Sequence, residues 1–73
     1  MTKPTERAIQ EYAKENLLLA EFRRAEADLY DNAAREAAAG IQHETDEYLR
    51  LNQAVIAAGK RLPKRFKHLR KGI

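Results

Sequence analysis

The stretch AAAGIQHETDEYLRL, residues 37–51, predicts a turn between two helices. Gly40 follows three alanines, and glycine is the residue that most readily takes the left-handed backbone conformation that ends a helix. Ile41 then stands where an apolar residue often packs back on the last helical turn. Thr45 can cap the start of a second helix, and the two acids after it suit the first turn of that helix. We therefore expect the chain to fold back on itself between Gly40 and Thr45.

The sequence on both sides of this turn favours helices. Only three Gly and two Pro interrupt the 73 residues, and no run alternates between apolar and polar residues as a strand would. Pro4 suits a first helical turn, so we expect one helix over residues 4–39 and a second over residues 45–58. Asp31 and Asn32 could cap a fresh start, which leaves open a break inside the first helix. The predicted fold class is all-α, a small helical hairpin or bundle whose helical body comprises residues 1–58.

Apolar residues recur at helical spacing in both long segments. In the first segment six larger ones fall on one broad arc, which we expect to be buried: Tyr12, Leu18, Leu19, Phe22, Leu29 and Tyr30. In the second segment four residues form a stripe that should pack on that arc: Tyr48, Leu51, Val55 and Ala58.

The remaining residues, 59–73, read GKRLPKRFKHLRKGI. Gly59 can end the second helix, and Pro63 can begin a third. The apolar residues from Leu62 onward are spaced four, three and four apart, which predicts a short basic amphipathic helix over residues 63–71 with one apolar side. Leu49 and Ile56 lie off the main stripe of the second helix. They are the expected docking site for this C-terminal segment.

Charge is divided very unevenly along the chain. Residues 1–50 carry seven Lys/Arg and eleven Asp/Glu, a net charge of −4, whereas residues 51–73 carry seven Lys/Arg and no acid, a net charge of +7. Such a concentrated positive field attracts anionic partners. We expect these bases to contact DNA or RNA phosphates: Lys60, Arg61, Lys64, Arg65, Lys67, Arg70 and Lys71. Two alternatives remain open, a solvated tail that balances the acidic body and, less favoured, weak binding to a membrane surface.

Two carboxylates fall inside the apolar arc of the first helix. Glu15 and Glu26 lie about three turns, or roughly 16 Å, apart, which is too far for paired acid/base catalysis. Because burying a lone carboxylate is costly, each should reach the rim of the core, face Arg50 or the basic tail, or await a partner. Together with Leu49 and Ile56 they form the candidate protein-partner face.

The sequence gives no support for an enzyme. It contains no Ser, no Cys and no Gly-rich phosphate loop, and no set of residues closes a metal site, so we expect neither a cofactor nor a bound metal. The absence of Cys, of an apolar leader and of a membrane-spanning run makes the cytoplasm the expected location.

The small size, helical character and acidic body with a basic tail resemble the layout of small phage and plasmid proteins that bind host machinery, including RNA polymerase. This resemblance is one of layout and carries no motif. It implies a non-enzymatic transcription regulator that docks on a nucleic-acid machine and contacts DNA or RNA with its tail. The alternative is a homo-oligomeric assembly module, a homodimer for example, with an incidental basic tail.

Overall fold

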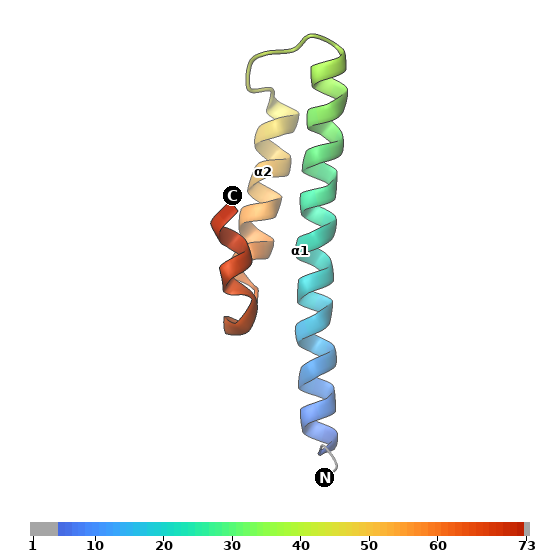
Figure 1. Cartoon of the computed structure of the whole chain (residues 1–73), viewed down its shortest axis with the longest axis vertical. Coiled ribbons are helices and arrows are strands. Elements are labelled where there is room, and N and C mark those ends of the chain that lie inside the picture. The colour runs from blue at the N-terminus through green and yellow to red at the C-terminus, as the bar shows by residue number, and fades with distance from the viewer. Residues whose placement is uncertain (1–4, 73) are drawn as a thin grey trace.

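The protein is an all-α helical hairpin, as its sequence predicts. The computed structural model describes residues 5–72, with side chains for residues 5–70. Within that part lie α1 (Glu6–Ala38), α2 (Asp46–Lys60) and a 3-10 helix, η1 (Lys64–Gly72). α2 runs back along α1, and η1 lies beside the second half of α2 (Figure 1). The molecule measures 56 × 17 × 17 Å, and its long axis follows α1.

α1 begins at Glu6 because Thr5 caps it. The Thr5 hydroxyl accepts a hydrogen bond from the backbone N–H of Ala8 at 3.1 Å, which satisfies one of the free donors of the first turn. The helix therefore starts two residues after Pro4, which lies outside the described residues. α1 continues through Asp31 and Asn32, so the break left open there does not occur.

The turn between α1 and α2 has the predicted chemistry. Gly40 has a φ of +76°, and the backbone N–H of Ile41 donates to the carbonyl of Glu36 at 2.9 Å, which closes the end of α1. Thr45 caps α2 by accepting from the N–H of Tyr48 at 3.0 Å. Its hydroxyl also donates to the Glu36 carboxylate, which ties the start of α2 to the end of α1.

The core lies between the two long helices at the η1 end of α2. Five apolar residues are buried: Phe22, Leu51, Val55, Ala58 and Leu62. Leu19, Leu29, Phe66 and Leu69 are among the half-buried side chains that pack around this core. The centre of each predicted stripe is therefore confirmed.

The predicted burial of Tyr12 and Tyr30 is wrong, since their side chains are 61% and 65% exposed. Both residues lie about 80° around the axis of α1 from Phe22, at 3.6 residues per turn. The single short helix α2 covers only the strip of α1 nearest to it, so residues at the edge of a broad arc remain in solvent.

The amino-terminal turns of α1 extend beyond α2 and η1 (Figure 1). Ile9 and Leu17, in the first half of α1, are more than half exposed. Both lie about 140° around the axis from Phe22, one on either side, so they face away from the core. None of the helices in the described part has the length and apolar character needed to cross a bilayer.

Candidate nucleic-acid interface

The basic C-terminal segment forms a 3-10 helix, whereas its sequence predicted an α-helical pattern. A 3-10 helix has three residues per turn, so side chains three apart eclipse one another. One row of η1 holds Phe66 and Leu69, both half-buried. A second row holds Lys64, Lys67 and Arg70, all exposed, and we call it the basic row. Arg65 and His68 form the third row. The side chain of Lys71 and all of Ile73 lie outside the described residues.

The apolar row anchors η1 on the core. Phe66 and Leu69 pack against a cluster that includes Phe22 of α1 and Val55 of α2. Leu49, half of the expected docking site, remains 45% exposed and takes no part in this cluster. The groove between two helices offers apolar contacts from both, whereas the outer face of α2 would offer contacts from one, and this favours the observed position.

Gly59 allows η1 to approach α2 closely. It does not end α2, which runs on to Lys60, and it is buried. A Cβ atom at this position would lie 3.2 Å from Cγ of Arg70 and 3.5 Å from Cε2 of Phe22. The glycine therefore serves packing, because even a methyl group would press on the Arg70 side chain.

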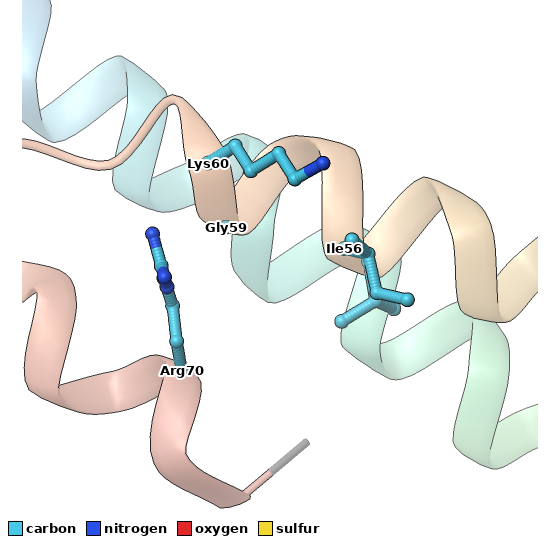
Figure 2. Close-up of a pocket in the computed structure, with 5 residues that line it drawn as sticks. Ile56, Gly59, Lys60 and Arg70 are labelled. Atoms are coloured by element: carbon cyan, nitrogen blue, oxygen red, sulfur yellow. The ribbon is translucent and has the colours of Figure 1, made fainter.

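A pocket of about 150 Å³ lies where η1 meets the end of α2. Val55, Ile56 and Gly59 line it together with two cations, Lys60 and Arg70. Figure 2 shows the Arg70 side chain rising from η1 toward Gly59, while the Lys60 side chain extends over Ile56. Ile56, the other half of the expected docking site, thus faces this pocket. The result is an apolar floor with a cationic group on either side.

Two of the predicted phosphate-binding bases instead contact acids of α1. Arg61 Nη2 lies 3.4 Å from Glu21 Oε2, and Arg65 Nε lies 3.6 Å from Glu15 Oε2. At 100° per residue Glu15 lies about 20° around the axis from Phe22, in line with the buried strip, whereas Glu21 lies about 100° from Phe22, at one edge of that strip. Arg61, which follows α2, and Arg65 of η1 therefore tie the basic segment to α1 at two positions.

Arg65 is held further by two aromatic rings. Its Cζ atom lies 5.2 Å from the centre of the Tyr12 ring and 4.5 Å from that of Phe66, within the range of cation–π attraction. The exposed ring of Tyr12 thus covers a cation of the tail. Tyr12 was predicted to lie in the core, and Glu21 was not among the predicted site residues. Contact between Glu15 and the basic tail was one of the alternatives left open for that residue, whereas no sequence signal singled out Glu21.

Glu26 does not meet the tail or Arg50. Its carboxylate accepts from Nη1 of Arg23, one turn earlier on α1, at 2.9 Å. Arg50 bonds to Glu47 within α2, with its Nε 3.1 Å from Oε2. That hydrogen bond, followed by the charge of Arg50, lowers the pKa of the exposed Glu47 carboxyl. Of the two predicted carboxylates, only Glu15 contacts the basic segment.

The remaining bases of the segment have no acid partner within the described residues. These exposed side chains are Lys60, Lys64, Lys67 and Arg70. No group of three or more metal-ligating side chains comes together in the part of the chain that the structure describes. Comparisons of the chain with protein families, with curated proteins and with solved structures find no match.

Proposed function

We propose that this protein is a small non-enzymatic regulator that binds nucleic acid through the basic row and Lys60. The observation that carries the proposal is a set of four exposed cations, unpaired within the described residues, on η1 and the end of α2. Lys and Arg side chains that neutralise phosphates release condensed counterions, and this release drives binding. Cations already paired with carboxylates contribute less, because they must first give up that partner.

The support under these cations also favours a binding role. Phe66 and Leu69 pack η1 against the core, so its basic row stands on a helix that tertiary contacts support. Ordering a segment on binding costs conformational entropy, and a segment that is already ordered avoids most of that cost.

Binding of the purified protein to labelled oligonucleotides, followed by fluorescence anisotropy, tests the proposal. We expect a triple variant, Lys64→Gln with Lys67→Gln and Arg70→Gln, to lose at least tenfold in affinity at low salt while its circular dichroism stays helical. Affinity that is unchanged in this variant would remove the basic row from the binding surface.

We propose further that the helical body docks on a protein of a transcription machine such as RNA polymerase. Ile9 and Leu17 support a docking role, because they are exposed apolar side chains on the side of α1 that faces away from the core. The regulator would then act by occupancy, blocking a competing factor or holding nucleic acid in a charged channel. Co-purification of polymerase with the wild-type protein, and its loss on combining Ile9→Asp with Leu17→Asp, is the expected result.

The same two side chains favour one other function, that of a homodimeric assembly module. In that case α1 would pack on α1 of a second copy, and the basic tail would be incidental. Analytical ultracentrifugation separates the two proposals. A tight dimer that ignores oligonucleotides would support assembly, and a monomer that binds them would support regulation.

A further inference from the structure

The basic row of η1 is straight, and its spacing is regular. With three residues per turn and a rise of about 2.0 Å per residue, Lys64, Lys67 and Arg70 follow one another at intervals of about 6 Å. An α-helix would instead turn successive residues of an i, i+3 series by about 60° around its axis, since it has 3.6 residues per turn. The 3-10 geometry of η1 therefore aligns three cations that an α-helix would spread around its surface.

The basic row continues at its far end into α2. Arg70 and Lys60 line the same pocket, although they lie on different helices. Gly59 permits this meeting, because a side chain there would press on Arg70. Four cations thus follow one path from Lys64 along η1 to Lys60.

The other basic side of η1 is occupied from within the molecule. Arg65 stands one residue after Lys64, yet it contacts Glu15 and lies over the rings of Tyr12 and Phe66. Arg65 of the third row therefore holds η1 against α1, while Arg70 of the basic row lines the pocket shared with α2. Arg65 thus binds α1, whereas Lys64, one residue earlier, has no acid partner in the described part of the chain.

We propose that the basic row binds consecutive phosphates of one nucleic-acid strand, with the pocket between Arg70 and Lys60 taking the last of them. The inference rests on the proposed function and adds to it which cation meets which phosphate. We call this correspondence the register. The backbone positions that carry these cations are about 6 Å apart along η1. This interval is comparable with the separation of neighbouring phosphates along a strand, so each long side chain can reach one phosphate. The pocket of about 150 Å³ is large enough for a phosphate group between its two cationic walls.

Three variants test the register. Lys67→Gln removes one charge from the basic row, Arg65→Gln removes one from the third row, and Lys67→Gln combined with His68→Lys moves the charge of residue 67 by one position. The probes are a short single-stranded oligothymidylate and a duplex of the same length. Affinities are measured over a salt series, and circular dichroism checks the helicity of each variant.

We expect Lys67→Gln to weaken single-strand binding several-fold and to reduce the slope of log affinity against log salt by about 0.7. Arg65→Gln should leave that slope unchanged, and the relocated charge should not restore binding. Restoration by the relocated charge, equal losses in Lys67→Gln and Arg65→Gln, or binding to the duplex alone would overturn the register. A wild-type protein that binds neither probe would overturn the proposed function as well, so the two failures are distinguishable.

Discussion

Lys64 and Arg65 are neighbours in the sequence and carry the same charge, but they have different surroundings in the structure. Arg65 contacts Glu15 and lies between two aromatic rings, whereas Lys64 has no acid partner in the described part of the chain. Arg61 likewise contacts an acid of α1, Glu21. The acids of α1 thus hold two bases of the tail, whereas Lys60 and the basic row have no acid partner in the described part of the chain. Counting bases in the sequence overstates the charge that is free for binding.

Replacing Glu15 and Glu21 with Gln should release these two bases. We expect oligonucleotide affinity to rise several-fold, because Arg61 and Arg65 become free to meet phosphates. Stability should fall by less than about 1 kcal/mol per pair, since partly exposed ion pairs contribute little. The measurements are fluorescence anisotropy and urea denaturation.

A matched control removes two acids that lie away from the tail, Glu6 and Glu44, by the same substitution. Both variants change the net charge equally, so a purely global charge effect would raise affinity to the same extent in both. That outcome would contradict a specific role for Glu15 and Glu21.

Asn32 is a polar residue in an apolar position. It is 4% exposed, and its Nδ2 amide has no hydrogen-bond partner within the described residues. A buried donor left unsatisfied costs about 1–3 kcal/mol. Asn32→Leu should therefore raise the free energy of unfolding by about 1 kcal/mol, measured by urea denaturation. Asn16→Leu is the control, because the Asn16 amide already donates to the Tyr12 carbonyl at 2.8 Å. A destabilised Asn32→Leu variant would contradict this account.

At the scale of elements, Gly40 allows the chain to leave α1 and turn back toward α2. Its φ of +76° is unfavourable for residues with a Cβ atom, although no other atom lies within 4 Å of the place where that Cβ would be. The cost of a side chain here is therefore one of backbone conformation alone.

Gly40→Ala should lower stability by about 1–2 kcal/mol, which is the cost of the left-handed conformation. Gly40→Asn should cost less, because asparagine tolerates this conformation better than alanine. Thermal unfolding of the two variants gives the comparison. Equal stability of the wild type and Gly40→Ala would show that the turn does not need glycine.

The two long helices and the turn were predictable because local rules decide them. Gly40 and Thr45 act through backbone conformation and capping, both of which are readable from a few neighbouring residues. The 3-10 geometry of η1 was not predicted, since spacings of four and three also fit an α-helix. The sequence nevertheless contains a period of three from Pro63, with Phe66 and Leu69 as its apolar members. The docking position of η1 depends on Gly59 and Phe22, which meet only in the folded chain.

At the scale of the whole molecule, the protein is a rod 56 Å long with one long helix as its spine. The molecule has two separate surfaces. One holds the exposed apolar residues Ile9 and Leu17 on α1, and the other holds the cations on η1 and at the end of α2. Such a layout allows one molecule to hold a protein partner and a nucleic acid together. The presence of a basic surface was predictable from composition. Which bases belong to that surface was not predictable, because the pairing of Arg61 and Arg65 with acids of α1 depends on where the tail lies in the folded chain.

The salt dependence of single-strand binding tests the central claim most directly. Lys60 and the basic row are four cations without an acid partner in the described part of the chain, and they predict a slope of log affinity against log salt of about −3 at about 0.7 per phosphate. Contact by Lys71, whose side chain lies outside that part, would steepen this slope by about 0.7. Engagement of all seven bases of the tail would instead give about −5. A slope near −3 that falls almost to zero when Lys60 and the basic row are neutralised is the predicted result. A flat response of the wild-type protein would contradict nucleic-acid binding, and a slope near −5 would contradict the sequestration of Arg61 and Arg65.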